Sequence, residues 1–365
     1  MSQKKKVVVA MSGGVDSSVA AALLRQRGFE VIGVTMKLFS LPPEVCLDEN
    51  LRSCCGWKAV EDANQVCRQL GIPHYEIDLR REFEEKVIAN FCQEYIRGRT
   101  PNPCIRCNEL VKFAVLWERV GALAADFLAT GHHARVEYDE TSGRFLLKKG
   151  RDRAKDQSYF LYTLTQEQMS RTLFPVGPYT KPQVRRLARR LGLHVADRVE
   201  SQEICFVLDG DYVNFVRARD PEGFKPGPIL DQSGRQLGEH KGIANFTIGQ
   251  RRGMGIAWKR PLYVIAIDPE RNAVIVGEEK ELMKKKLLAK EVNLIAVDRL
   301  SFQVSVKAKI RYKHEEARAI LFPLEEKIVM VEFREPQRAI TPGQSVVFYQ
   351  KDVVLGGGII DEVLD

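Results

Sequence analysis

Residues 4–18 read KKKVVVAMSGGVDSS, and this stretch decides the fold of the first half of the chain. The consecutive valines predict a short buried strand at 4–10, and SSVAAALLRQRG at 17–28 predicts the helix that follows it. Between them, Gly13 and Gly14 let the backbone approach a ligand closely, and the amides of the turn and of the helix N-terminus converge on an anion. The stretch therefore predicts a phosphate-binding turn between a strand and a helix.

The side chains of Ser12, Asp16 and Ser17 affect how this turn can hold an anion. Ser12 and Ser17 add hydroxyl donors. Asp16 is the unusual member, because a carboxylate beside a bare phosphate repels it. Either Mg²⁺ lies between the two, or Asp16 holds the turn's own amides. The turn has no lysine to reach β- and γ-phosphates, so it does not match G-x-x-x-x-G-K-[ST]. It does not match G-x-G-x-x-G either.

SGGVDS at 12–17 resembles the PP-loop of ATP pyrophosphatases, which hold the pyrophosphate of ATP while a nucleophile attacks the α-phosphorus. The resemblance implies ATP with Mg²⁺, transfer of AMP to a substrate, and an adenine nucleotide alpha hydrolase-like fold. Ligands of open α/β sheets bind at the carboxyl ends of strands, which adds two positions to the turn itself. The expected nucleotide contacts are Ala10, Met11, Ser12, Gly13, Gly14, Val15, Asp16, Ser17, Met36 and Gly131.

Strands and helices alternate up to residue 134. The pattern predicts strands at 31–38, 74–79 and 126–134, and helices at 57–71, 83–98 and 108–122. Such alternation predicts an α/β domain with a doubly wound, mostly parallel sheet covered by helices on both faces.

The pattern changes at about Asp209. Gly and Pro become frequent in 220–238, and short β-branched segments follow at 292–297, 304–312, 318–322, 327–333 and 345–350. Closely spaced segments of this kind predict a small antiparallel barrel or sandwich. We predict an ATP-binding catalytic domain at 1–208, a small central linker domain at 209–285, and a C-terminal β-barrel domain at 286–365.

The composition is that of an ordinary globular protein, with 44% hydrophobic and 28% charged residues. No apolar run approaches the roughly 20 residues that a membrane-spanning helix needs, and the apolar N-terminal stretch is too short for a signal peptide. We expect a cytoplasmic protein without a membrane partner. The net charge of +8 is compatible with a polyanionic partner, and equally with a basic enzyme that binds nothing larger than a nucleotide.

Two segments present basic faces. In 180–191, Thr180 and Gln183 match a capping box, and four arginines lie opposite the apolar stripe: Arg185, Arg186, Arg189 and Arg190. In VSVKAKIRY at 304–312, basic residues alternate with apolar ones. Either face contacts solvent or a polyanion.

Most of the eight cysteines are expected to have no role in catalysis. A cytosolic compartment keeps thiols reduced, so no disulfide framework is expected. Cys67 and Cys92 fall in predicted helices and are expected in the core. Cys46, Cys54 and Cys55 share one loop, where zinc is conceivable, but no clear fourth ligand is present, and ordinary loop cysteines are favoured.

Three cysteines remain for chemistry. TPNPCIRCNEL places Cys104 and Cys107 just before a predicted helix, where a helix N-terminus lowers the pKa of thiols. The C-x-x-C spacing alone fits a redox pair or half of a zinc site. SQEICFV adds Cys205. Activating a carbonyl oxygen with AMP brings in no sulfur, whereas a persulfide on one cysteine, attacked by another, would supply it.

Eight motifs follow one order along the chain: SGGVDS, PNPC-x-x-CN, ATGHHA, KDQSYFL, SQEICF, FTIGQRRG, the RY of KIRY, and PGQSVVFY with LGGGII. Together they resemble the tRNA-specific 2-thiouridylases, the MnmA family, over nearly the whole chain. The resemblance implies ATP-dependent thiolation at C2 of the wobble uridine of tRNA, with sulfur arriving as a persulfide from a cysteine desulfurase or relay protein.

The resemblance also implies roles for single residues. Cys107 corresponds to the first catalytic cysteine and Cys205 to the persulfide carrier. Asn102 and Pro103, with the residue after them, match the segment that touches the target base. The other implied tRNA contacts are His132, Lys155, Asp156, Gln157, Arg311, Tyr312 and Gln344.

Cys104 departs from the family pattern, because many members have Asp there, as the proposed general base. Two hypotheses follow. Cys104 acts as a thiolate base or supports the persulfide route, or Cys104, Cys107 and Cys205 ligate three irons of a 4Fe-4S cluster with one iron open to sulfide. The cluster is slightly favoured.

Two other functions compete with thiolation. A PP-loop amidating synthetase needs an ammonia source, and no glutaminase-like domain is visible. A non-catalytic, nucleotide-dependent RNA-binding module predicts that serine at Cys107 and Cys205 leaves function unchanged.

Overall fold

The computed structural model describes residues 4–40, 57–198, 204–208 and 210–364. They form two compact units. The first contains the residues up to 87, with 104–210 and 352–354, and the second contains 88–103, 211–351 and 355–365. Residues 88–103 thus group with the later part of the chain, and the predicted domain boundaries after 208 and 285 stay predictions.

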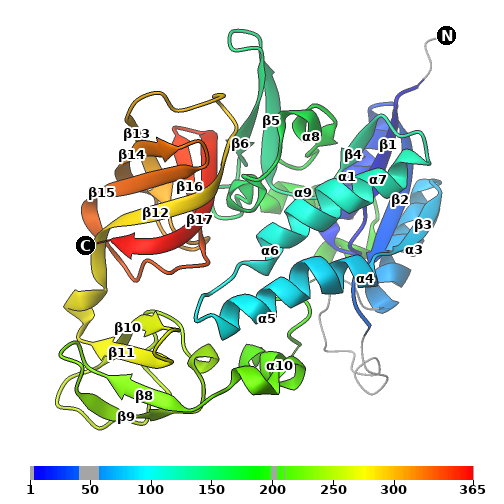
Figure 1. The fold of residues 1–365 in the computed structure, drawn as a ribbon. Coiled ribbons are helices and arrows are strands. Elements are labelled where there is room, and N and C mark those ends of the chain that lie inside the picture. The colour runs from blue at the N-terminus through cyan, green and yellow to red at the C-terminus, as the bar shows by residue number, and fades with distance from the viewer. Residues whose placement is uncertain (1–3, 41–56, 199–203, 209, 365) are drawn as a thin grey trace. The chain divides into compact units, whose positions relative to one another are not determined.

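The first unit is built on a parallel five-stranded sheet (Figure 1). Its order is β3-β2-β1-β4-β7, formed by β1 (Lys6–Ala10), β2 (Glu30–Lys37), β3 (His74–Asp78), β4 (Phe127–Ala129) and β7 (Thr172–Leu173). Every pairing in it is parallel. This confirms the predicted doubly wound α/β fold, in which the strands extend in both directions from β1.

Both faces of this sheet are covered. Val7 and Val9 of β1 share a core with α1 (Val15–Gln26), α3 (Trp57–Leu70) and α9 (Lys181–Arg190). Val8 points to the opposite face, because side chains alternate along a strand, and it is fully buried too.

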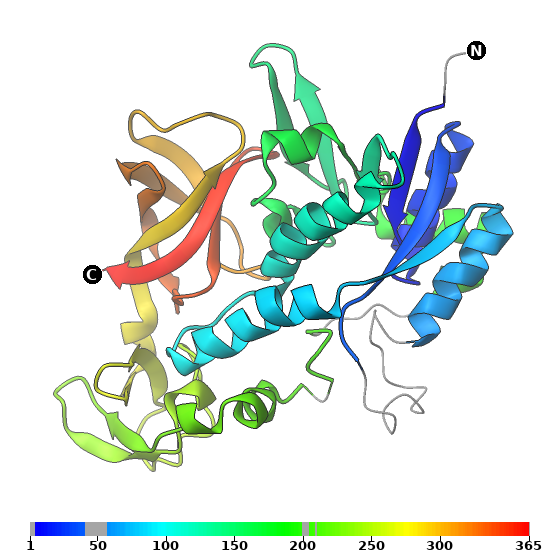
Figure 2. The same cartoon turned by 45° about the vertical axis from the view of Figure 1, so that its right-hand side comes forward.

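Helices of the 80–121 region are longer and less regular than the sequence pattern predicts. The predicted helix at 83–98 consists of α4 (Arg80–Phe83), the π-helical η1 (Glu84–Ile88) and α5 (Ala89–Ile96). The predicted helix at 108–122 begins earlier, at the PNPC motif. It runs through α6 (Pro103–Arg106), the π-helical η2 (Cys107–Val115) and α7 (Leu116–Gly121), which follow one another directly in Figure 2.

The predicted strand at 126–134 is divided in two. Sheet pairing ends with β4, and β5 (Ala134–Asp139) starts an antiparallel hairpin with β6 (Arg144–Lys149). Residues 130–133 between them leave the sheet at the carboxyl end of β4. The short elements η3 (Ser158–Leu161), α8 (Gln166–Ser170) and η4 (His194–Asp197) complete this unit.

The second unit holds a small mixed sheet of order β10-β11-β8-β9. Its strands are β8 (Gly227–Leu230), β9 (Gln236–His240), β10 (Tyr263–Asp268) and β11 (Ala273–Gly277). Three 3₁₀ helices connect these elements: η5 (Pro221–Gly223) precedes β8, η6 (Ile243–Asn245) lies between β9 and β10, and η7 (Glu279–Leu282) follows β11. Helix α10 (Tyr212–Arg219) stacks on α5 through Tyr212 and Tyr95, whose ring centroids are 4.3 Å apart.

The last part of the second unit is a closed antiparallel barrel, as predicted (Figures 1 and 2). Its strands are β12 (Met283–Leu294), β13 (Val304–Lys309), β14 (Ala317–Glu325), β15 (Ile328–Arg338), β16 (Ser345–Gln350) and β17 (Val353–Leu364). Pairing of β12 with β17 closes it. Gly356 is required at this seam, because a Cβ there would lie 2.3 Å from the carbonyl oxygen of Asn293. Barrel closure removes the exposed strand edges of an open sheet.

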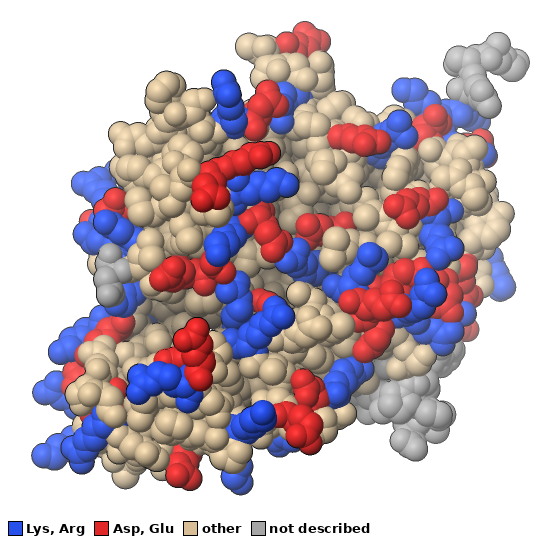
Figure 3. Space-filling model, viewed as in Figure 1, with Lys and Arg blue, Asp and Glu red and all other residues tan. Residues whose placement is uncertain are grey.

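None of the described helices combines the length and the apolar character needed to cross a membrane. On the face drawn in Figure 3, basic and acidic side chains are interspersed. The positive net charge is therefore not gathered into a single-sign patch on that face.

Candidate functional site

The phosphate loop has a backbone conformation that requires glycine at position 13. Gly13 has a φ of +66°, and a Cβ there would lie 2.4 Å from the carbonyl oxygen of Ala59 in α3. The hydroxyl of Ser17 accepts from the amide of Ser12 at 3.2 Å and donates to the carbonyl of Gly14 at 3.1 Å. This hydroxyl thus shapes the turn, and the first-turn amides of α1, which have no partner within the helix, are the donors suited to an anion.

The ATGHHA segment lies directly against this loop. A Cβ on Gly131 would be 2.6 Å from the amide nitrogen of Ser17 and 2.8 Å from the carbonyl carbon of Asp16. Gly131 therefore allows the end of β4 to contact the first turn of α1. Met36, the other expected nucleotide contact outside the loop, is buried near the carboxyl end of β2, the strand beside β1. Both positions lie at the carboxyl edge of the sheet, where ligands of such sheets bind.

Asp16 pairs with two buried side chains that neither sequence interpretation included. Its Oδ2 accepts from Nζ of Lys181 at 2.6 Å, and its Oδ1 lies 3.2 Å from Nε2 of His133. The Lys181 and His133 side chains are 8% and 3% exposed. Burial alone would raise the pKa of Asp16, but the hydrogen bond with His133 and the charge of Lys181 outweigh burial and lower this pKa. Asp16 is therefore an anion balanced by a lysine from α9.

Sequence reasoning missed Lys181 and His133, although a signal was present for the first. Lys181 is the first residue of α9. A cation there faces the positive end of the helix dipole, which is unfavourable without a compensating anion. Such a placement points to an acidic partner outside the helix. For His133 the repeated histidine of ATGHHA gave no indication of which ring faces the loop.

The arginines of α9 divide into two groups. Arg185 donates to the carbonyls of Ala196 and Arg198, and Arg189 donates to Asp197 at 2.6 Å. These contacts within the protein account for the positions of both guanidinium groups, without a contact to phosphate. The capping box is confirmed, since the amide of Thr180 donates to Oε1 of Gln183 at 2.8 Å. Arg186 and Arg190 are exposed.

A second long-range contact reaches the phosphate loop from the segment after α9. Arg198 donates to the carbonyl of Gly13 at 2.9 Å and forms an ion pair with Asp62 of α3. His194 lies 3.1 Å from the other oxygen of Asp62. The loop is thus connected to α3 and to the chain that leads toward Cys205.

All three chemically assigned cysteines lie in the first unit, with the phosphate loop. Cys104 is exposed, Cys107 is 8% exposed, and Cys205 is half-buried. Asn108, next to Cys107, is buried and donates to the carbonyl of Phe160 at 3.0 Å, which fixes this turn of the helix. Phe206, next to Cys205, packs edge-on against Phe83, with 5.7 Å between the ring centroids.

The described residues offer no site for the iron–sulfur cluster. No group of three or more His, Cys, Asp or Glu side chains in the described ranges is arranged to hold a metal ion. Cys104, Cys107 and Cys205 are all described, so as they stand they do not fit a cluster that needs three thiolates together. Cys67 and Cys92 are buried core residues, as predicted. Cys46, Cys54 and Cys55 lie outside the described residues.

The implied tRNA contacts of the first unit have defined structural partners. Asp156 is buried and accepts from the amides of Gly150 and Ser158, and Gln157 accepts from the amide of His133 at 2.9 Å. These two side chains hold the loop after β6, while Lys155 beside them is half-buried. Their contact with tRNA stays a prediction.

His132 is held in a largely aromatic environment. Its Nδ1 lies 2.7 Å from Oγ1 of Thr130, and its ring packs near those of Phe113 and Phe174. Burial, followed by the charges of Lys112 and His133, lowers the pKa of His132 well below its usual value. A neutral imidazole can stack or exchange hydrogen bonds with a base, but it brings no charge to a phosphate.

One implied tRNA contact of the second unit, Gln344, lies against the start of the PNPC motif. Gln344 donates to the carbonyls of Thr100 and Pro101, at 2.9 and 3.2 Å, directly before Asn102 and Pro103. In the barrel, Arg311 donates to the carbonyls of Arg338 and Ala339, and Lys309 lies over the ring of Tyr312. Gln344 therefore positions the segment expected to touch the target base.

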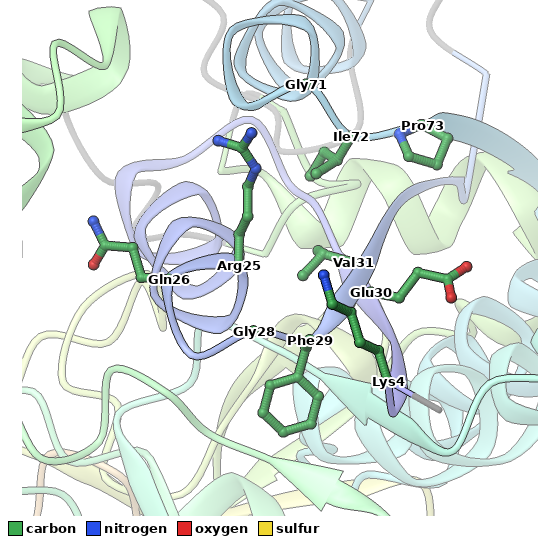
Figure 4. A pocket seen from close by; sticks show the side chains of 10 residues that line it. All are labelled: Lys4, Arg25, Gln26, Gly28, Phe29, Glu30, Val31, Gly71, Ile72 and Pro73. Atoms are coloured by element: carbon green, nitrogen blue, oxygen red, sulfur yellow. The ribbon is translucent and has the colours of Figure 1, made fainter. Parts of the chain in front are cut away.

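A surface hollow of about 480 Å³ lies elsewhere in the first unit (Figure 4). Its lining includes Lys4, Glu30 and Pro73, which stand at or just before the amino ends of β1, β2 and β3. The phosphate loop follows the carboxyl end of β1, so the hollow belongs to the opposite edge of the sheet.

Comparison with known proteins agrees with this layout. Three family models match consecutive parts of the chain: a tRNA methyl transferase HUP domain at 5–209, a tRNA methyl transferase PRC-barrel domain at 214–278, and an aminomethyltransferase beta-barrel domain at 284–360.

Curated relatives extend over the full length. The tRNA-specific 2-thiouridylase MnmA 1 of Caldanaerobacter subterraneus subsp. tengcongensis is 52% identical over 99% of both chains. The tRNA-specific 2-thiouridylase MnmA of Moorella thermoacetica is 52% identical over 98% of this chain and 99% of its own. A solved 4-thiouridine synthetase–RNA complex with bound ATP shares 15% identity over 60% of this chain and 51% of its own, with a TM-score of 0.34, too low to support an argument.

Proposed function

The chain belongs to the family of tRNA-specific 2-thiouridylases, and from this premise we propose that it replaces the C2 oxygen of the wobble uridine of tRNA with sulfur at the expense of ATP. One observation carries the proposal beyond family membership. The phosphate loop and the three cysteines assigned to chemistry belong to the same compact unit. The residues that we assign to adenylation and to sulfur transfer thus lie in one compact unit.

The reaction needs three displacements. The C2 oxygen of uridine attacks the α-phosphorus of ATP, and pyrophosphate leaves from the amides of the phosphate loop. The terminal sulfur of a persulfide on Cys205 then attacks C2, and AMP leaves with the former C2 oxygen. The thiolate of Cys107 attacks Sγ of Cys205, which releases the sulfur on C2 and leaves a Cys107–Cys205 disulfide. A thiol reductant and a new persulfide donor must restore the two cysteines.

The carboxylates and thiols of the described residues indicate which metal cofactors this part of the chain can hold by itself. Asp16, the acidic member of the loop, is paired with Lys181 and His133, and no acidic cluster elsewhere in the described ranges can hold a cation. We therefore propose that Mg²⁺ arrives bound to the phosphates of ATP, as is usual for this ion. The cluster hypothesis has no support from the described cysteines, so we propose the persulfide route, with a sulfur donor protein as partner.

The competing functions have weaker support. The family models carry the name of a methyl transferase, but methyl transfer requires neither a pyrophosphate-binding loop nor paired thiols. An amidating synthetase would likewise leave Cys107 and Cys205 without a role. A binding module without catalysis does not explain why the segments of Cys107 and Cys205 are each fixed by buried neighbours, Asn108 and Phe206.

Mass analysis of tRNA nucleosides from cells that lack the gene tests the function directly. We expect 2-thiouridine derivatives to disappear from tRNA and to return when the gene is restored. Other thiolated nucleosides serve as the internal control, because they require different enzymes. Unchanged 2-thiouridine would refute the assignment.

Cys104→Asp distinguishes the persulfide route from cluster ligation. Aspartate is the residue that the family pattern implies at this position, and the exposed site of Cys104 accepts a carboxylate without burying a charge. We expect the variant to keep thiolation activity within about threefold, since one missing ligand of a cluster would cost far more. The measurement is 2-thiouridine formed per enzyme in iron-free buffer. Activity that depends on added iron, and is lost in this variant, would favour the cluster.

A further inference from the structure

The phosphate loop contains no lysine, yet the fold brings one to it. Lys181 is 165 residues from Asp16 along the chain, and its Nζ lies 2.6 Å from the carboxylate in the first turn of α1. The lysine side chain is 8% exposed. Burying an ammonium is costly unless it is paired and hydrogen-bonded. The pair with Asp16 meets this requirement in the described structure.

The Asp16–Lys181 pair stands next to groups that are arranged for an anion. Asp16 and Ser17 form the first turn of α1, where helix amides lack intrahelical partners. Gly131 lies so close that a Cβ would be 2.6 Å from the amide of Ser17. His133 holds the other oxygen of Asp16, and its Nδ1 is buried without a hydrogen-bond partner among the described residues. The lysine is thus fixed beside the expected position of the phosphates.

The charges explain why the loop contains an aspartate. A lone carboxylate in the loop would repel the polyphosphate of ATP, whereas a carboxylate paired with an ammonium is nearly neutral to it. An ammonium also has three N–H donors in a tetrahedral arrangement, so it can bridge a carboxylate and a phosphate oxygen at the same time. The hydrogen bond from Lys181 to Asp16 then fixes the position of the lysine ammonium.

We propose that Lys181 contacts the β- and γ-phosphates of ATP, and that Asp16 and His133 are positioning residues that hold its ammonium at the loop. The lysine that other phosphate loops carry within their sequence is supplied here by the first residue of α9. The inference rests on the proposed function only in its use of ATP, and it is independent of the tRNA and sulfur steps.

Lys181→Met tests the contact through nucleotide affinity. We expect the full-length variant to bind ATP about 10- to 100-fold more weakly, the usual effect of losing a charge-assisted hydrogen bond, while AMP affinity changes less than about twofold. Isothermal calorimetry with ATP and with AMP gives both values. Arg186→Met is the matched control, because it removes an exposed cation from the same helix. Equal weakening of ATP and AMP would overturn the contact.

Asp16→Asn/Lys181→Met separates phosphate contact from simple neutralisation. If Lys181 only cancels the charge of Asp16, the doubly neutral variant should regain the ATP affinity of the unmodified protein, and the proposal would be wrong. If Lys181 contacts the phosphates, the double variant stays about 10-fold or more weaker for ATP. Asp16→Asn alone should retain ATP binding better than Lys181→Met.

Folding is monitored by thermal unfolding of each variant. Lys181→Met leaves the partly buried carboxylate of Asp16 without its cation, so it can fail to fold, whereas the double variant leaves no unpaired charge there and provides the same ATP-to-AMP comparison. If the unmodified protein does not thiolate tRNA while Lys181→Met still weakens ATP binding more than AMP binding, the proposed function is refuted and this inference stands. A double variant with normal ATP affinity would refute the inference alone.

Discussion

Cys205→Ser and Cys107→Ser are each expected to lower 2-thiouridine formation by about a thousandfold or more, while ATP and tRNA bind as before. A hydroxyl at 205 cannot carry a persulfide, and a hydroxyl at 107 is a far poorer nucleophile toward sulfur than a thiolate. Neither substitution alters the phosphate loop, since Ser and Cys have nearly the same size. The measurement is 2-thiouridine by mass spectrometry, with pyrophosphate release recorded in parallel.

Cys67→Ala is the matched control for these substitutions. Cys67 lies in the same unit but is fully buried, and burial raises the pKa of its thiol to about 12. Such a thiol is almost entirely protonated at neutral pH and takes no part in exchange chemistry. We expect thiolation by Cys67→Ala to stay within about twofold of the unmodified protein. Normal thiolation by Cys107→Ser or Cys205→Ser would contradict the proposed sulfur transfer.

Gly131→Ala is expected to have the second largest effect, through the phosphate loop. The added Cβ would lie 2.6 Å from the amide nitrogen of Ser17 and 2.8 Å from the carbonyl carbon of Asp16. Both are backbone atoms, which cannot rotate away as a flexible side chain can. The β4 end and α1 must therefore separate, at a cost of about 1–3 kcal/mol in unfolding free energy. ATP binding should weaken about 10- to 100-fold, because the first-turn amides shift.

Gly121→Ala provides the comparison for this prediction. Gly121 ends α7 in the same unit, and no heavy atom lies within 4 Å of the Cβ that alanine would add. We expect no loss of stability and unchanged ATP affinity, since Ala has a higher helix propensity than Gly. Chemical denaturation and ATP titration of the two variants give the comparison. Equal effects of both substitutions would show that contact between the β4 end and α1 is unimportant.

Local sequence patterns predicted much of the fold, including the strand–turn–helix that contains the proposed phosphate loop. Alternating strands and helices gave the parallel sheet, and the β-branched segments after 285 gave the barrel. The strand predicted at 126–134 was too long, because Gly131 and its neighbours leave the sheet to contact α1. The helix predicted at 108–122 began too late, since the PNPC motif reads as a turn although Pro is favourable in the first turn of a helix.

The strand–turn–helix at SGGVDS was determined by the sequence itself, because the backbone freedom of glycine, the run of valines and the helix-forming residues after the turn are properties of residues a few positions apart. Only the tertiary structure decided what Asp16 does, since its partners Lys181 and His133 are 165 and 117 residues distant. The same holds for Cys104 and Cys107, which are three residues apart on one helical run, one exposed and one buried. Charge pairing and burial depend on which segments fold back onto a site, and no local pattern contains that information.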